Sequence, residues 1–364
     1  FFFSLSLITF PSHPPNFQEN QPAAMCRPDS PRSTATPYLH RPDQGHENAS
    51  LPLKTEPPLS FVSSALLTFC GLAFNLSLAH TIPMIFNSSS SKIFEYASFN
   101  YDDPSDGRRR RVYFDNTWMT FATDYALALE MALIIAYICR TSRRSPVRDG
   151  TVGLLAGYGV SVLVGGLAHQ FVRSTEDMNS VAFRVAWIIC VGPVVIQAGF
   201  IGAIGSAIHS TFPSDDTHFR VPLVPGWAWI LYAGILTAHV AAGGFSMYRP
   251  AADIFLAGCT QFVPTVYITA VVMCRKWRPQ TVTEADGSGV VGPVARAVYL
   301  ISSYWLALML PFYVVLTLHG GFTLGEVNLL LHINLAVAWG CQGLVLRRYC
   351  LQCPAAALLV KKTI

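Results

Sequence analysis

The sequence has few charged residues, and this scarcity excludes several classes of protein. Only 13% of its 364 residues are Asp, Glu, Lys or Arg, whereas about one-quarter of a soluble domain is usually charged. The formal net charge of +4 is small and scattered through polar segments, which does not indicate a nucleic-acid surface. We therefore expect no nucleic-acid partner, and membrane lipid as the immediate surroundings of the chain.

Several catalytic and cofactor signatures are also missing. Lysine is absent between Lys92 and Lys276, so no predicted core span offers the amine that a retinal Schiff base needs. There is no Gly-rich phosphate loop, no GxSxG elbow and no HExxH helix. The nine cysteines are dispersed, unlike a secreted disulfide framework. Cys350 and Cys353 form one CxxC beside two arginines, a pattern typical of palmitoylation at a membrane exit or of two unmodified thiols.

Long apolar runs are what the sequence has in abundance. Hydrophobic residues make up 52% of the chain, with a mean hydropathy of +0.39, and several runs approach the roughly 20 apolar residues that cross a bilayer as a helix. They predict an all-α polytopic membrane helical bundle with seven core transmembrane helices plus an extra N-terminal helix. The predicted core spans are 118–139, 151–171, 181–208, 226–248, 252–274, 294–318 and 324–346.

Polar segments divide the chain around these runs. Residues 1–58 are rich in Pro, Ser, Asn and Gln, which predicts a disordered N-terminal segment. Residues 59–80 predict an apolar helix or signal-anchor, and 81–117 a polar loop. The seven-helix transmembrane domain follows at 118–346 and a cytoplasmic tail at 347–364.

The basic residues between the spans predict an orientation. Arginine and lysine gather in 140–148, in 275–278 and after residue 346, which lie on one side if there are seven core spans. The positive-inside rule then puts the C-terminus in the cytoplasm. The arginine run 108–111 is an exception on the opposite side. We expect an integral protein of an endomembrane or the plasma membrane.

Ionisable side chains inside four of the predicted spans lie at similar depths. Asp124, His169, His239 and His332 each fall in the half of a span nearest the same membrane face, and Asp177 lies just beyond the second core span. At 1.5 Å per residue, Asp124 and His332 are roughly 9 Å inside and His239 roughly 13 Å. Ionisable groups are costly in hydrocarbon, so their convergence predicts a lumen-facing polar pocket.

The residue types leave three interpretations of this pocket open. Imidazoles and a carboxylate bind zinc when water takes the open position. The same groups also form proton relays, or hydrogen-bonded clasps between helices. His239 by itself is typical of a packing histidine, and Asp177 of a solvated loop charge.

Short motifs carry a resemblance to a known superfamily. The segments are Thr-Asp-Tyr at 123–125, Gly-Gly-Leu-Ala-His at 165–169 and Leu-His-Ile-Asn-Leu-Ala at 331–336. They resemble the seven-transmembrane group of alkaline ceramidases and progestin and adiponectin receptors, which hold zinc through a second-span His, an Asp near the third span and a seventh-span HxxxH pair. That motif is incomplete here. Ala336 occupies the position of the second His of the pair, and Gly165 occupies the position of a Ser that usually lies four residues before the second-span His.

The resemblance implies a leading hypothesis, zinc-dependent hydrolysis of a lipid amide. It implies zinc ligation by His169, His332 and either Asp177 or His239. Zinc would lower the pKa of its bound water and polarise the amide carbonyl, and Asp124 would act in catalysis by orienting a ligand or helping to move a proton. The alternative is a non-enzymatic receptor for a small-molecule ligand, or a proton or solute carrier, in which these residues form a structural network or relay.

Overall fold

The computed structural model describes most of the chain from residue 57 to residue 353. The described residues are 57–88, 98–102, 109–113, 115–212, 221–239, 241, 257–274, 291–319 and 322–353. The predicted disordered segment 1–58 therefore lies outside the described residues, except for its last two positions.

Helices make up most of this part of the chain. They are α1 (Phe61–Ser88), α2 (Trp118–Thr141), α3 (Pro146–Phe171), α4 (Thr175–Asn179), α5 (Val181–Thr211), α6 (Gly226–His239), α8 (Phe262–Cys274), α9 (Pro293–His319) and α10 (Leu324–Gln352). A short antiparallel hairpin of β1 (Ser98–Asp102) and β2 (Arg109–Tyr113) lies in the segment that the sequence predicts as a polar loop.

Within the described residues, five helices are long and apolar enough to cross a membrane. They are α1, α2, α3, α5 and α10. Because roughly 20 apolar residues span a bilayer, the chain is a helical multi-pass membrane protein. The described parts of α6 and α8 contain 14 and 13 residues, which is less than a full crossing, so the count of seven core spans stays a prediction.

Local capping chemistry sets where two of these helices begin. The Ser145 side chain accepts a hydrogen bond from the backbone N–H of Arg148, and Pro146 occupies the first turn of α3, where a missing N–H is harmless. This cap starts α3 five residues before the predicted start at 151. Thr323 and Glu326 form a reciprocal capping box at the start of α10. The helix continues to Gln352, so the predicted tail begins as helix.

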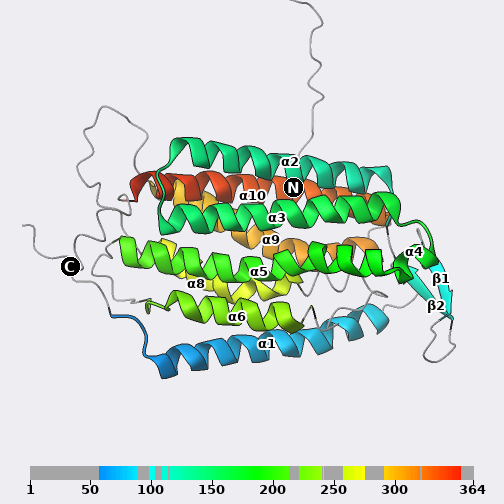
Figure 1. Cartoon of the computed structure of the whole chain (residues 1–364), viewed down its shortest axis with the longest axis horizontal. Coiled ribbons are helices and arrows are strands. Elements are labelled where there is room, and N and C mark those ends of the chain that lie inside the picture. The colour runs from blue at the N-terminus through cyan, green and yellow to red at the C-terminus, as the bar shows by residue number, and fades with distance from the viewer. Residues whose placement is uncertain are drawn as a thin grey trace, which may run out of the picture. The chain divides into compact units, whose positions relative to one another are not determined.

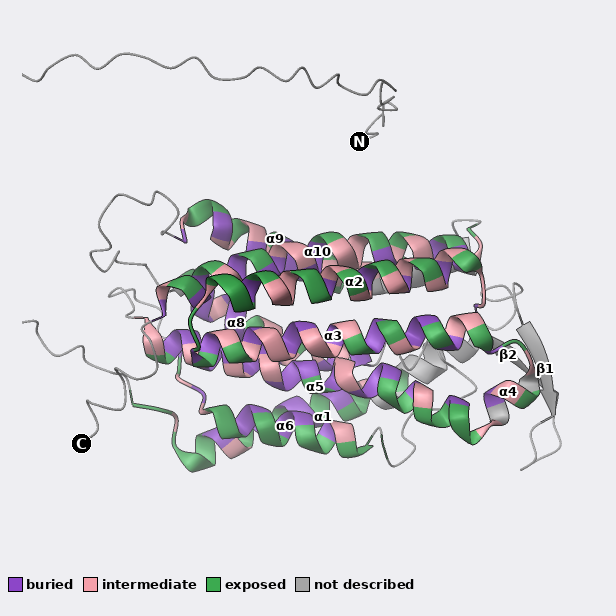
Figure 2. Cartoon of the chain, turned by 45° about the horizontal axis from the view of Figure 1, so that its top comes forward, coloured by how far each residue is buried: buried purple, intermediate pink, exposed green. Residues whose placement is uncertain are grey.

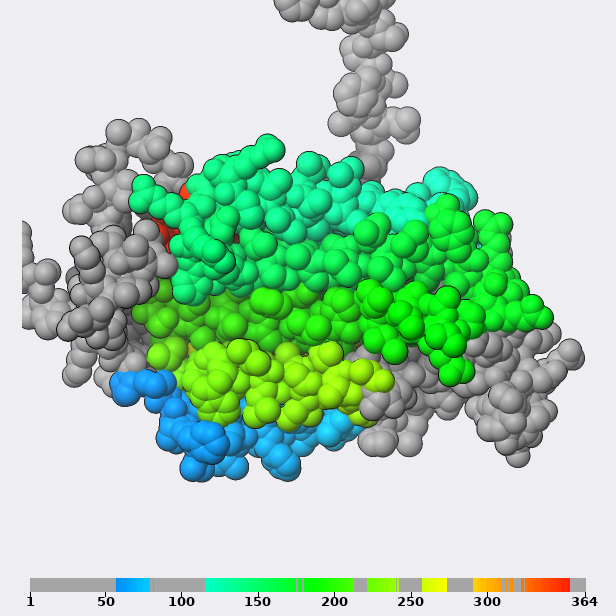
Figure 3. All heavy atoms as spheres, viewed as in Figure 1, coloured from blue at the N-terminus to red at the C-terminus, as the bar shows by residue number. Residues whose placement is uncertain are grey.

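The helices α2, α3, α5 and α6 lie side by side, with α1 against α6 (Figure 1, Figure 3). Helix α10 packs against α2 and α9. A Cβ on Gly325 would meet Thr117, and one on Gly343 would meet Ile134, so α10 and α2 run parallel and begin at the same end of the bundle. We call this end the site end and the opposite one, where α2 and α10 finish, the arginine end.

Glycines allow the central helices to approach closely. A Cβ on Gly157 of α3 would overlap the Gln197 amide of α5, and one on Gly202 would overlap the Trp229 ring of α6. With its amide oriented to satisfy both neighbours, Gln197 donates to the Leu154 carbonyl (3.1 Å) and accepts from the Gly157 N–H (3.3 Å). Since lipid is itself apolar, such close packing and interhelical hydrogen bonding hold a membrane bundle together.

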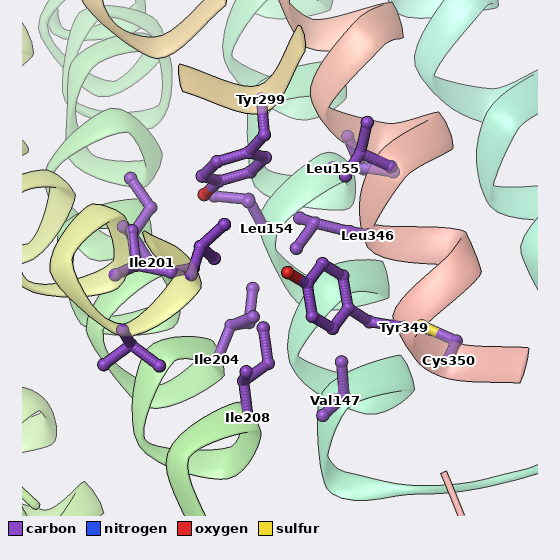
Figure 4. Close-up of a cluster of buried hydrophobic side chains, with 14 of the residues drawn as sticks. Val147, Leu154, Leu155, Ile201, Ile204, Ile208, Tyr299, Leu346, Tyr349 and Cys350 are labelled. Carbon is purple, nitrogen blue, oxygen red and sulfur yellow. The ribbon is translucent and has the colours of Figure 1, made fainter. Parts of the chain in front are cut away.

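A large apolar cluster fills the space between α3, α5, α9 and α10 toward the arginine end (Figure 4). Val147, Ile204 and Tyr349 are fully buried there. Cys350 and Cys353 are also buried, so the folded chain covers the thiols for which the sequence favours palmitoylation or no modification. Exposed residues lie on the outward faces of the helices (Figure 2), which is where a membrane protein meets lipid.

Candidate functional site

A network of buried polar side chains lies at the site end of the bundle. It connects the residues before α2 with α2, α3 and α10. Its members are Asp115, Thr117, Thr120, Thr123, Asp124, His169, Asn328 and His332. Asp115 and Asp124 are only 2% and 3% exposed, and buried polar groups require partners within the protein.

Asp115 has more partners than any other member, and it is absent from the predicted site. Its Oδ1 accepts from the Thr117 N–H (2.9 Å), and its Oδ2 accepts from the Thr120 hydroxyl and from Asn328 Nδ2 (2.8 Å). A carboxyl group that only accepts is best satisfied as the charged carboxylate. An Asp two residues before Thr117, where a helix begins, is a local turn pattern that could have identified it. Its partner Asn328 precedes His332 by four residues, so sequence spacing places it on the same helix face and at a similar depth but does not identify this contact.

The backbone of Asp115 also orients His169. The Nδ1 atom of this imidazole hydrogen-bonds the Asp115 carbonyl oxygen. Because a carbonyl can only accept, Nδ1 carries the hydrogen, and in the neutral ring Nε2 then carries the lone pair. Metal-binding histidines are usually oriented by such a bond from the other ring nitrogen. His169 is thus fixed at the end of α3 with a defined tautomer.

The structure brings Asp124 and His332 into direct contact. His332 Nε2 lies 3.3 Å from Asp124 Oδ1, and His332 Nδ1 lies 2.7 Å from the hydroxyl oxygen of Thr123. The Thr123 hydroxyl is also 2.6 Å from the Met119 carbonyl and 2.9 Å from the Thr120 carbonyl. The Thr123 hydroxyl can therefore donate to a carbonyl and accept from His332 Nδ1–H, or donate to a bare Nδ1 in the other tautomer of the ring.

The contact between Asp124 and His332 needs a hydrogen or a cation between its two facing atoms. With Nδ1 protonated, a neutral His332 would turn the lone pair of Nε2 toward the lone pairs of Asp124 Oδ1. Two acceptors at 3.3 Å repel each other unless a positive charge lies between them. In this tautomer the pair holds an added proton or another cation, whereas in the other tautomer Nε2–H of the neutral ring donates to Asp124 Oδ1.

The second carboxylate oxygen of Asp124 has a different environment. Oδ2 is buried and has no hydrogen-bond partner among the residues that the structure describes. A Cβ on Gly165 would lie 3.8 Å from this oxygen and 3.3 Å from the Cys190 sulfur. The nearby Ser161 hydroxyl donates instead to the Cys190 carbonyl (2.5 Å). An unpaired buried acceptor costs about 1–3 kcal/mol, so this oxygen can receive a donor or a cation.

The other two predicted ligands lie apart from this network. His239 ends α6 with an exposed side chain. Asp177 lies in α4, where its Oδ2 accepts from the backbone N–H groups of Arg173 and Ser174, both at 2.9 Å. These bonds, that of Arg173 first, hold the pKa of Asp177 below its usual value. The carboxylate of Asp177 is therefore used in capping α4.

A metal ion needs more donors than this network groups together. Across the described ranges, no group of three or more His, Cys, Asp or Glu side chains is arranged to hold a metal ion. Asp124 and His332 supply a pair of donors, and zinc usually takes at least three protein ligands. Zinc at this site stays a prediction.

Comparison of the chain with protein-family models, with curated proteins and with solved structures finds no match. The geometry of the polar network is therefore the basis for assigning a function.

Proposed function

We propose that this multi-pass membrane protein is a proton relay or proton-coupled carrier, with the Asp124–His332 contact as its proton-binding centre. The observation that carries the proposal is the facing of Asp124 Oδ1 and His332 Nε2 at 3.3 Å, a distance at which the two side chains can share or exchange a proton. Paired acids and histidines inside membrane bundles are typical of proton pathways. Zinc is a second candidate for the cation at this contact.

Each neighbour has a definite part in this proposal. Thr123 hydrogen-bonds His332 Nδ1 at 2.7 Å and so leaves Nε2 as the nitrogen that exchanges the proton with Asp124. The charged Asp115 carboxylate, close by and held by three donors, favours a positive charge on the pair. Asp124 Oδ2 provides a second position for the proton or for an incoming donor.

The test is proton movement in vesicles. Purified protein is reconstituted into liposomes that contain a pH-sensitive dye, and internal pH is followed after an external acid jump. We expect Asp124→Asn, which keeps the shape and removes the charge, to reduce the rate to that of protein-free vesicles. Glu176→Gln is the matched control, because Glu176 is an exposed carboxylate on α4 at the same end. Wild-type rates in Asp124→Asn would exclude the proposal.

Zinc-dependent hydrolysis of a lipid amide is the second candidate. Its specific support is His169, whose Nδ1–H bond to the Asp115 carbonyl is the orientation usual for a metal-binding histidine. His169 would be one ligand of the ion, which when bound would supply a Lewis acid and an activated water, although no three candidate ligands are grouped within the described residues. Metal analysis separates the candidates: stoichiometric zinc that is lost in His169→Ala favours the hydrolase, and metal-free folded protein rejects it.

We also propose that the arginine end faces the cytoplasm. The positive-inside rule supports this orientation, and the parallel course of α2 and α10 puts the end of α10 on the same side as the arginine-rich loop after α2. Cys139 is exposed near this end. A membrane-impermeant maleimide should label it only after cells are permeabilised, with Cys139→Ser as the control for other thiols.

A further inference from the structure

Arginines crowd the end of the bundle opposite the polar network. Six of them lie in residues 138–149 and 344–353, together with one acidic residue, Asp149, and no lysine. Asp149 pairs with Arg144 (3.4 Å) and Arg148 (3.3 Å). The arginines without a carboxylate partner in the described part of the chain are Arg140, Arg143, Arg347 and Arg348. This end therefore carries a local excess of uncompensated positive charge.

One of these arginines packs on a tyrosine of α2, and another follows that tyrosine by one helical turn. The guanidinium carbon of Arg347 is 4.0 Å from the centre of the Tyr137 ring, and its Nε donates to the Thr141 hydroxyl at 2.9 Å. These contacts fix the Arg347 side chain, from α10, against α2. Arg140 follows Tyr137 by three residues on α2, so both project from the same face of that helix. Arg347 thus lies over the ring and Arg140 follows one helical turn later, and within the described residues no acidic side chain pairs with either.

Exposed apolar side chains continue from this point along the membrane-facing surface. On α2, Leu129 and Leu133 precede Tyr137 at four-residue spacing and are 61% and 62% exposed. On α10, Leu344 precedes Arg348 by four residues and is 50% exposed. Residues four apart share a face of a helix. An apolar stripe that ends in arginines matches the chemistry of a lipid, with acyl chains followed by a charged headgroup.

We propose that this α2–α10 surface binds an anionic phospholipid, with its phosphate between Arg140 and Arg347 and an acyl chain along Leu133 and Leu129. Guanidinium groups match phosphate oxygens in shape and can donate two hydrogen bonds at once. Because Tyr137 and Thr141 already hold Arg347 in place, little side-chain freedom is lost on binding. This preorganisation separates the site from a diffuse attraction between basic loops and anionic membranes.

The test measures lipid binding to the full chain purified in an uncharged detergent. Native mass spectrometry follows bound lipid during titration with phosphatidylglycerol or with phosphatidylcholine of the same acyl chains. We expect preferential binding of phosphatidylglycerol, and an apparent affinity about 30-fold lower in the Arg140→Gln/Arg347→Gln double variant. The matched control, Arg173→Gln/Arg184→Gln, removes two exposed arginines at the site end and should bind as the wild type does.

Three results would overturn the proposal. One is equal binding of the two lipids, and another is an equal loss in the control variant. The third is displacement of phosphatidylglycerol by inorganic phosphate at the same concentration, which would indicate a site for a soluble anion. Arg140→Gln alone guards against misfolding, since Arg140 has no side-chain partner in the described residues. It should fold normally and still bind phosphatidylglycerol more weakly.

Discussion

Replacement of Asp115 by alanine tests whether the polar network holds the site end together. The change removes the acceptor of two buried donors, the Thr120 hydroxyl and the Asn328 amide. Each buried donor left unpaired costs about 1–3 kcal/mol. Two unpaired donors together would cost about 2–6 kcal/mol. The Thr120 hydroxyl keeps the Thr117 hydroxyl at 3.2 Å as a partner, so we expect a loss in the lower half of that combined range, about 3 kcal/mol.

Two further variants isolate the contact between Asp115 and Asn328. Asn328→Ala removes one donor and leaves the carboxylate with two others, so we expect a smaller loss, about 1–2 kcal/mol. The double variant should lose less than the sum of the single ones, with a coupling energy of about 1 kcal/mol, as for other hydrogen bonds between membrane helices. Asp115→Asn keeps the volume and one acceptor oxygen, and should be intermediate.

The measurement is the free energy of unfolding in mixed micelles, followed by tryptophan fluorescence as the fraction of denaturing detergent increases. Glu176→Ala is the control, because its carboxylate is exposed at the same end, and such surface changes usually stay within about 0.5 kcal/mol. A loss below about 0.5 kcal/mol in Asp115→Ala would mean that the network does not stabilise this end of the bundle. Strict additivity in the double variant would show that Asp115 and Asn328 do not stabilise each other.

The surroundings of single residues give three more tests. Asp124 Oδ2 lies 3.8 Å from the position of a Cβ on residue 165, so Gly165→Ser brings a hydroxyl within reach of this oxygen. In the same unfolding assay, Gly165→Ser should be about 1 kcal/mol more stable than Gly165→Ala. Equal stability of the two variants would argue against an unpaired oxygen. The lowered pKa of Asp177 means that its charged cap stabilises the fold above the ordinary carboxyl pKa of about 3.9 and is lost as pH falls through the lowered value. The stability difference between wild type and Asp177→Asn should therefore vanish in strong acid, and a constant difference from pH 7 to pH 2 would contradict this role. Burial raises the pKa of Cys353 to about 11. A maleimide at pH 7 should therefore modify the exposed Cys139 first and Cys353 only on unfolding, as followed by peptide mass spectrometry. Equal rates of modification would mean that the end of α10 exposes Cys353 to solvent.

Much of the helical layout can be predicted from the sequence, because its causes are local. Apolar runs predict where helices lie in lipid, and α2 begins at Trp118 as expected. The predicted start of α3 is five residues late, since the polar cap Ser145–Pro146 precedes the apolar run and only its hydrogen bond reveals it. The hairpin of β1 and β2 lies in a segment without a strong apolar pattern, so the sequence predicts only a polar loop there.

Depth in the membrane identifies several members of the site, but depth cannot decide contacts. Asp124 and His332 lie at the same predicted level, and the structure brings them within 3.3 Å. His239 meets the same criterion, yet it is an exposed side chain at the end of α6. Asp177 is the nearest acid in sequence, but the backbone of its own short helix takes up its carboxylate.

Apolar runs alone predict that this chain is a helical membrane protein. An exposed backbone polar group is costly in lipid, and a helix satisfies all of these groups within one segment. Which polar groups meet depends instead on how the helices pack. Asp115 and Asn328 are 213 positions apart, and each helical residue turns its side chain by about 100°. A hydrogen bond needs atoms within about 3 Å, so the rotation and register of α2 against α10 select these partners. No local stretch of residues determines that rotation or that register.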